Sequence, residues 1–119
     1  MKDFRDLIVW SKSHELTLEV YKLTENFPKE EMFGLKSQIR RASASIPANI
    51  AEGCGRSSNG DFARFLYNGM GSTCELEYHL LLSKDLGYIP ANDHKRVDAS
   101  VVEIKRMLSS LIAKVNSER

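Results

Sequence analysis

Residues 38–53 read QIRRASASIPANIAEG, and this stretch decides which fold the chain can adopt. Its apolar residues recur every three or four positions, a spacing that predicts a helix with one apolar face. Pro47 stands in the middle of that helix. Because proline has no amide hydrogen and its ring collides with the carbonyl four residues back, an interior proline costs a helix about 3 kcal/mol and usually kinks it. We therefore expect a helix that is kinked at Pro47.

The side chains around Pro47 are small, which lets another helix approach closely. They are Ala42, Ser43, Ala44, Ser45, Ala48 and Ala51. Asn49 falls on the apolar face, where its amide needs hydrogen-bond partners. One interpretation is a buried amide that is satisfied by a carbonyl freed near Pro47, notably that of Ser43 or a neighbour, and that fixes the register of packing. The other is that Asn49 contacts a ligand.

The composition is that of an ordinary globular protein, with 42% hydrophobic residues and a formal net charge of +1. A chain of 119 residues forms one domain, here 1–119. No overall basic excess points to nucleic acid, and Cys54 and Cys74 lack the spacing of a redox or zinc motif. The apolar runs fall short of the about 18 residues that span a bilayer. Since the N-terminus is polar and has no signal-peptide apolar region, we expect a cytoplasmic protein.

Four helical stretches follow from the spacing of apolar residues and from the breakers between them. We expect the first over residues 6–26, the second from about residue 30 to 53, and the third from an N-cap at Ser58 or Asn59 to a C-terminal cap at Gly87. The fourth carries one apolar stripe, formed by Val97, Val101, Ile104, Leu108, Leu111 and Val115. Long helices with short connections predict an all-α, antiparallel up-down-up-down four-helix bundle.

Several apolar residues lie outside the stripes that such a bundle buries. They are Leu7, Ile8, Leu18, Leu81 and Leu82. Because one bundle buries only about a third of each helix surface, we expect these side chains to stay partly exposed. They predict that the chain self-associates.

Five motifs follow one another over most of the chain. They are Phe4-x-x-Leu7-x-x-Trp10, Phe27-Pro28-x-x-Glu31-x-x-Gly34-Leu35, Gln38-x-x-Arg41, Ser45-Ile46-x-x-Asn49-Ile50-Ala51-Glu52-Gly53 and Gly71-Ser72-x-x-Glu75-Leu76. In type and order they resemble the motifs of a family of bacterial four-helix-bundle proteins, first noticed in intervening sequences of large-subunit ribosomal RNA genes. The resemblance implies a four-helix bundle.

The family includes the accessory variability protein of diversity-generating retroelements. That protein assembles as a barrel of five bundles and binds nucleic acid and a reverse transcriptase. The resemblance therefore implies a ring-like, pentameric homo-oligomer, with RNA, DNA or a nucleic-acid enzyme as partner. This chain is nearly neutral, whereas the retroelement protein is strongly basic.

The charged residues of the second helix separate onto two flanks. At about 100° per residue, Lys36 and Arg40 fall together on one flank. With Arg56 they are the candidate nucleic-acid-binding residues, because copies repeated around a ring would raise weak phosphate contacts into useful affinity. The alternative is a solvated face on which Arg56 pairs with Glu52, four residues earlier.

The opposite flank of the second helix carries Arg41 and Glu52, and it faces either the matching flank of the third helix or a different neighbour. In an antiparallel hairpin, Arg41 lies level with Glu75, and Glu52 lies level with Arg64. We expect these four residues, like Asn49, to be structural or to cross a subunit interface; a ligand-binding role is the alternative. An exposed pair of this kind contributes about 0–1 kcal/mol, and burial at an interface makes the loss of one partner more costly.

No catalytic constellation emerges, so the sequence does not predict an enzyme. His14, His79 and His94 fall on different helices without the spacing of metal ligands, and no serine or cysteine has an adjacent base. We predict no metal, no cofactor and no small-molecule substrate. The sequence instead predicts a homo-oligomer that acts as a binding or scaffold protein. The alternative is a purely structural oligomer with an unknown protein partner and no nucleic-acid binding.

Overall fold

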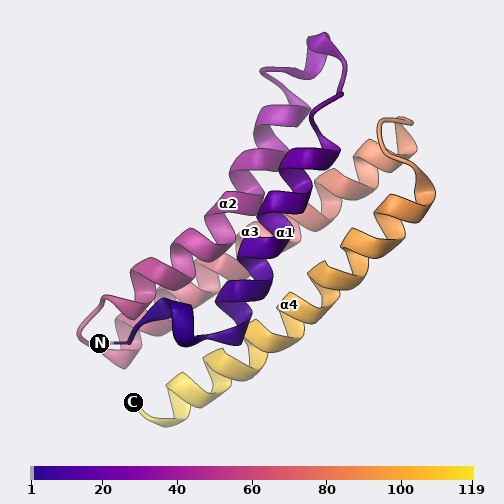
Figure 1. Cartoon of the computed structure of the whole chain (residues 1–119). Helices are drawn as coiled ribbons and strands as arrows, with labels where there is room; N and C mark the ends of the chain where they lie inside the picture. The colour runs from indigo at the N-terminus through magenta and orange to yellow at the C-terminus, as the bar shows by residue number, and fades with distance from the viewer. Residues whose placement is uncertain (1) are drawn as a thin grey trace.

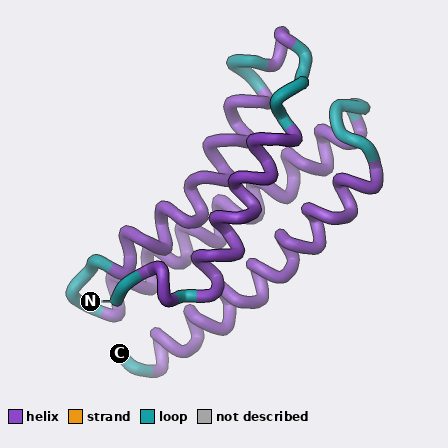
Figure 2. Tube along the Cα trace, in the orientation of Figure 1, coloured by secondary structure: helices purple, strands orange, loops and turns teal. Residues whose placement is uncertain are grey.

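The computed structural model describes residues 2–119, which form helices and turns and contain no strand. The α-helices of this part of the chain are α1 (Ile8–Leu23), α2 (Leu35–Cys54), α3 (Asn59–Asp85) and α4 (Ala91–Ser117). They run alternately in opposite directions, so that both chain ends lie at the same end of the bundle (Figure 1). Short loops join them (Figure 2). This arrangement confirms the predicted all-α, up-down four-helix fold.

Helix α1 is shorter at both ends than the sequence predicts. Residues Phe4–Asp6 form a separate 3-10 turn, and Leu7 is extended (φ −89°, ψ 125°), so α1 begins at Ile8. At the other end the helix stops at Leu23. The Thr24 hydroxyl folds back there and donates to the Val20 carbonyl at 2.8 Å.

Helix α2 begins later than predicted because the residues before it form their own turn. Lys29–Glu31 is a 3-10 turn, and Gly34 has a non-helical backbone, so α2 starts at Leu35. The carboxylate of Glu31 then caps the helix by accepting from the Leu35 amide at 3.1 Å. It also accepts from the Tyr88 hydroxyl at 3.0 Å, and this hydrogen bond raises the pKa of Tyr88. Glu31 therefore ties together the two loops at one end of the bundle.

Both predicted caps of α3 are present. Ser58 Oγ accepts from the Asp61 amide at 3.1 Å at the start of the helix. At its end Gly87 adopts φ 81°, and the Tyr88 amide donates to the Ser83 carbonyl at 2.8 Å. This is the Schellman arrangement, in which a glycine in the left-handed region lets the chain turn away from the helix.

The core lies between the four inner faces, and the molecule measures 45 × 24 × 19 Å. Its largest fully buried side chains are Ile39, Ile46, Ile50, Leu66, Leu76, Leu80, Ile104 and Leu108. Among the positions that differ from the expected stripes are Leu111 and Asn49. Ile112 is buried in place of Leu111, which is half-exposed, and Asn49 lies half-buried at the edge of the α2 face. At Leu111 the helix period of 3.6 residues moves the buried position by one residue, whereas Asn49 lies beside the buried Ile46 and Ile50.

Helix α2 continues through Pro47, which is buried. The kink at Pro47 stays a prediction. Of the apolar residues expected outside the core, Ile8, Leu18 and Leu81 are exposed, whereas Leu7 and Leu82 are half-buried. None of the helices in residues 2–119 has the length and apolar character needed to cross a membrane.

Candidate interaction surfaces

Helices α2 and α3 approach closely at two glycines. A Cβ atom placed on Gly53 would lie 2.9 Å from Phe62 Cδ1 and 3.0 Å from Phe65 Cβ, so a larger residue has no room there. At Gly69 the same construction meets the Asn49 Cβ at 3.8 Å, an ordinary van der Waals distance. The α2–α3 seam is therefore tightest beside Gly53, near the hairpin turn.

A small polar cluster spans the same seam. Asn49 Nδ2 donates to the Ser45 carbonyl at 2.8 Å and lies 3.1 Å from Ser45 Oγ. Ser72 Oγ of α3 lies 3.0 Å from Ser45 Oγ, which links the two helices. The Asn49 amide thus finds the carbonyl of Ser45, two residues before Pro47.

The carbonyl that Pro47 deprives of its helical donor is that of Ser43, four residues earlier. Thr17 of α1 supplies the missing donor, since its Oγ1 lies 2.9 Å from the Ser43 oxygen. The same hydroxyl lies 2.9 Å from the Ser13 carbonyl of its own helix. All of these groups are buried, so an unpaired carbonyl here would cost about 1–3 kcal/mol. Pro47 of α2 thus leaves a carbonyl without its helical donor, and Thr17 of α1 binds that carbonyl. This hydrogen bond joins the two helices.

The structure brings together one of the two predicted ion pairs across α2 and α3. Arg41 Nη2 lies 3.5 Å from Glu75 Oε2, with the Arg41 side chain 68% exposed. His79 Nδ1 lies 3.9 Å from the same carboxylate oxygen. Glu75 therefore lies between a side chain of α2 and one of its own helix.

The structure does not bring Glu52 and Arg64 together. Glu52 pairs with Arg56 at 3.4 Å, and Arg64 pairs with Asp61 at 3.6 Å. Both arginines have a nearer carboxylate, three or four residues away in the chain. Their guanidinium carbons also each lie 4.6 Å from the Phe65 ring centroid, which favours these positions through cation–π attraction.

The flank of α2 that carries Lys36 and Arg40 faces the end of α1. Arg40 Nε donates to Thr24 Oγ1 at 2.9 Å, and Arg40 Nη2 donates to the Tyr21 carbonyl at 3.0 Å. The guanidinium also lies 4.5 Å from the Tyr21 ring centroid. Lys36 Nζ lies 3.5 Å from the Glu25 carbonyl. A cation at the C-terminus of a helix is stabilised by the helix dipole, so this flank is a packing surface.

An outward-facing stripe runs along α3, away from the core. Its members are Tyr67, Gly71, Cys74, Tyr78 and Leu81, all exposed, at alternating spacings of four and three residues. The three large side chains are 57%, 59% and 41% exposed, respectively for Tyr67, Tyr78 and Leu81. Sequence reasoning identified Leu81 alone, because it followed one stripe per helix. The same spacing, applied to the outer side of α3, would have found the others.

An ion pair borders this stripe on the side of α4. Lys105 Nζ donates to Glu77 Oε1 at 3.0 Å. The hydrogen bond raises the pKa of Lys105 above its ordinary value, so the lysine stays charged at neutral pH. The pair ties α4 to α3 beside the exposed residues.

Metal-ligating residues are scattered in the part of the chain that the structure describes. No three of its His, Cys, Asp or Glu side chains are placed to hold a metal ion. Within residues 2–119, two imidazole nitrogens are buried without a hydrogen-bond partner, His79 Nδ1 and His94 Nε2. They belong to different helices, α3 and α4.

Comparison with known proteins decides the family. The model of the 23S rRNA-intervening sequence protein matches residues 5–110. The chain belongs to this family. A similar solved structure is that of a protein with unknown function from the S23 ribosomal protein family of Bacteroides thetaiotaomicron. It is 30% identical, has a TM-score of 0.80, and the match covers 88% of this chain and 98% of that chain. No curated protein matches the chain.

Membership of the 23S rRNA-intervening sequence protein family confirms the resemblance that the motifs indicated. In three dimensions several of those motif residues meet along the α2–α3 seam. Arg41 reaches Glu75, and Ser45 reaches Ser72. Gly53, the last residue of the motif that begins at Ser45, packs against α3. Three of the five motifs therefore lie on this one helical hairpin, α2 and α3.

Proposed function

We propose that this member of the 23S rRNA-intervening sequence protein family is a non-enzymatic scaffold that associates with copies of itself through the outer stripe of α3. One observation carries the proposal: α3 exposes five residues at the four-and-three spacing with which a helix packs against a partner helix. Tyrosine and leucine in such a stripe bury large apolar area on contact. Isolated exposed apolar residues need no explanation, whereas an aligned row marks an interaction surface.

The assembly we propose is a ring, and the family resemblance to a barrel of five bundles supports five copies. A closed ring needs two different patches on each copy, because each copy contacts its two neighbours with different surfaces. Helix α1 supplies a second patch with exposed Leu18 and Tyr21. Within residues 2–119, α1 and α3 are diagonal in the bundle, since each contacts α2 and α4 and the two do not contact each other.

The test is the mass of the purified protein by light scattering at micromolar concentration. We expect a multiple of the 13.5 kDa chain. Leu81→Glu should lower that mass, because it places a charge within the stripe, while circular dichroism remains helical. Leu86→Glu is the matched control: it makes the same change at an exposed leucine of the same region, outside the stripe, and should leave the mass unchanged. A wild-type monomer would remove the proposal.

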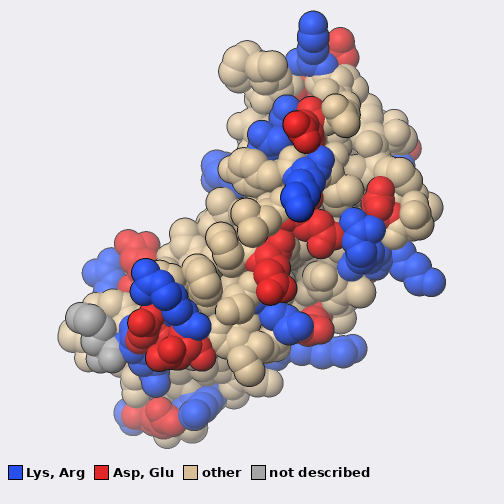
Figure 3. Space-filling view, viewed as in Figure 1, with Lys and Arg blue, Asp and Glu red and all other residues tan. Residues whose placement is uncertain are grey.

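A second candidate activity is binding of RNA or DNA by the assembled protein. The name of the family supports it, as does the repetition of Arg56 around a ring, whereas Lys36 and Arg40 contact backbone carbonyls at the end of α1. Positive and negative side chains alternate over the face seen in Figure 3. Binding to phosphates must weaken steeply with added salt. If wild type shows no salt-sensitive binding, a structural oligomer with a protein partner remains.

A further inference from the structure

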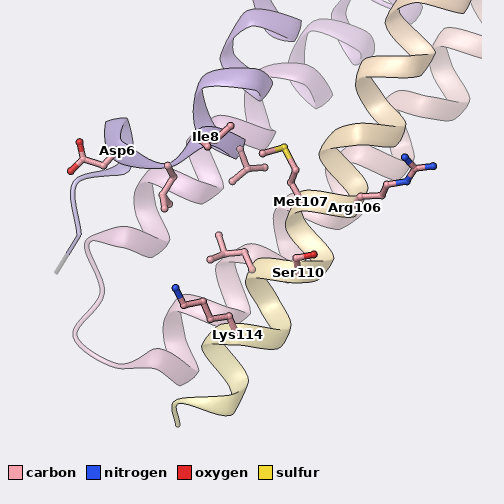
Figure 4. A pocket seen from close by; sticks show the side chains of 9 residues that line it. Asp6, Ile8, Arg106, Met107, Ser110 and Lys114 are labelled. Carbon is pink, nitrogen blue, oxygen red and sulfur yellow. The ribbon is translucent and has the colours of Figure 1, made fainter.

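An apolar groove lies between the N-terminal segment with the start of α1 and the second half of α4. Its volume is about 510 Å³. The apolar residues that line it are Leu7, Ile8, Val9, Met107 and Leu111. Ile8 is 67% exposed at the rim, and Met107 extends toward the N-terminal segment (Figure 4). The groove is thus an exposed apolar surface that is separate from the outer stripe of α3.

Two cations of α4 border this groove. Arg106 lies toward one end and Lys114 at the other, with Ser110 between them (Figure 4). The two side chains extend to opposite sides of α4, with Lys114 on the side of the N-terminal segment (Figure 4). Neither cation takes part in any ion pair within residues 2–119. The groove also has a carboxylate, Asp6, on its N-terminal side. An occupant that carries its own carboxylates on the side facing α4, away from Asp6, would complement both cations.

The dimensions of the groove fit two turns of a helix. Arg106 and Lys114 are eight residues apart, which places them about 12 Å apart along α4 at 1.5 Å per residue. Apolar residues at positions i, i+4 and i+7 of a bound helix span about 10 Å, and such anchors are how an amphipathic helix occupies an apolar groove. A groove of this volume has room for a few large side chains.

We propose that the α1–α4 groove binds an acidic amphipathic helix of a partner protein. The apolar residues of that helix enter the space between Leu7 and Leu111, and its carboxylates pair with Lys114 and Arg106. This surface is on α1 and α4, so the proposal does not depend on self-association through α3.

The probe is a fluorescein-labelled designed peptide of about 18 residues, with leucines at i, i+4 and i+7 and glutamates on the flank that faces α4. Fluorescence anisotropy measures its binding to the intact wild-type protein. The double variant Arg106→Glu/Lys114→Glu should weaken binding at least about tenfold. A peptide with lysines in place of the glutamates should recover binding to that variant. Lys95→Glu is the matched control, an exposed lysine of the same helix outside the groove.

Three outcomes would overturn the proposal. The wild-type protein fails to bind the peptide, or Lys95→Glu weakens binding as much as the groove variant does, which would mean attraction by overall charge. In the third, the groove variant changes the mass of the assembly in light scattering, which would make a second copy of the chain the occupant. Unchanged mass together with charge-swapped recovery supports the proposal, and it does so whether the wild-type protein is monomeric or oligomeric.

Discussion

Helix α2 is held by two seams of different chemistry. Toward α1, long or polar side chains reach backbone carbonyls: Arg40 binds the end of α1, and Thr17 binds Ser43. Toward α3, the contact depends on small residues, and Gly53 packs directly against Phe62 and Phe65. The α1 seam is therefore specified mainly by hydrogen bonds to backbone carbonyls. The α3 seam is specified mainly by shape, with the Ser45–Ser72 hydrogen bond as its polar link. Substitutions should affect them differently, because an unpaired buried polar group and an overfilled space cost free energy for different reasons.

We expect the largest loss of stability from a substitution at Gly53, because the α2–α3 seam has no space there for a side chain. Gly53→Val should lower the free energy of unfolding by about 3 kcal/mol or more, because Phe65 Cβ is fixed to the backbone and cannot move aside. Urea unfolding followed by circular dichroism at one protein concentration measures it. Gly69→Ala on the facing helix is the control and should stabilise by up to about 1 kcal/mol through helix propensity. Equal effects at the two glycines would show that the seam is not limited by shape.

The next largest effect is expected from Arg40, in the hydrogen-bonded seam. Arg40→Gln should cost about 2 kcal/mol, because it removes charge-assisted hydrogen bonds to Thr24 and Tyr21. Arg40→Lys should recover only part of this, since an ammonium does not reproduce the two-pronged geometry of a guanidinium. The measurement is again the urea midpoint. Lys36→Gln, whose contact with Glu25 is long at 3.5 Å, should change the midpoint little. If Arg40→Gln leaves the urea midpoint unchanged, Arg40 does not hold the end of α1, and this flank is a free basic surface.

The sequence was sufficient for the fold because its signals are local. Apolar spacing and breakers predict the helices, and Ser58 and Gly87 predict the caps of α3. The role of Arg40 was not predictable in the same way. It depends on where α1 ends: the helix stops at Leu23 and presents the Tyr21 carbonyl to Arg40, whereas the sequence predicted a helix to residue 26. A wheel places a side chain on a flank, but the partner of a long side chain depends on the neighbouring helix.

The two predicted ion pairs differ in outcome for a related reason. Antiparallel register correctly places Arg41 opposite Glu75. It also places Arg64 opposite Glu52, yet Asp61 lies only three residues from Arg64 and takes the contact. Register alone therefore predicts a pair only where no closer carboxylate competes. The sequence analysis missed the outer stripe of α3 for another reason. Its four-and-three spacing is present in the sequence, but it falls on the side of the helix opposite the apolar residues of the core.

A double-mutant cycle tests whether Pro47 and Thr17 act together. In the natural chain, Thr17→Val should cost about 1–2 kcal/mol, because it leaves the Ser43 carbonyl buried without a donor. Pro47→Ala restores a backbone amide for that carbonyl, so the cost of Thr17→Val should fall by about 1 kcal/mol when Pro47→Ala is also present. Urea unfolding of the four proteins gives the coupling. Strict additivity would mean that the threonine contributes by packing alone.

The smallest effect is expected at Arg41 and Glu75, the exposed polar contact of the shape-specified seam. Arg41→Gln should cost about 0–1 kcal/mol, because water screens the pair and long side chains lose entropy when they are held in place. Glu75→Gln in addition should recover part of any loss, since the unpaired carboxylate is then removed. The coupling should fall further in high salt, because exposed charges are screened. If the double-mutant coupling exceeds about 2 kcal/mol and resists salt, the pair is shielded from water in the native assembly. Arg41 would then lie in a subunit interface on the α2–α3 side, and the outer stripe of α3 would be only part of the contact between copies.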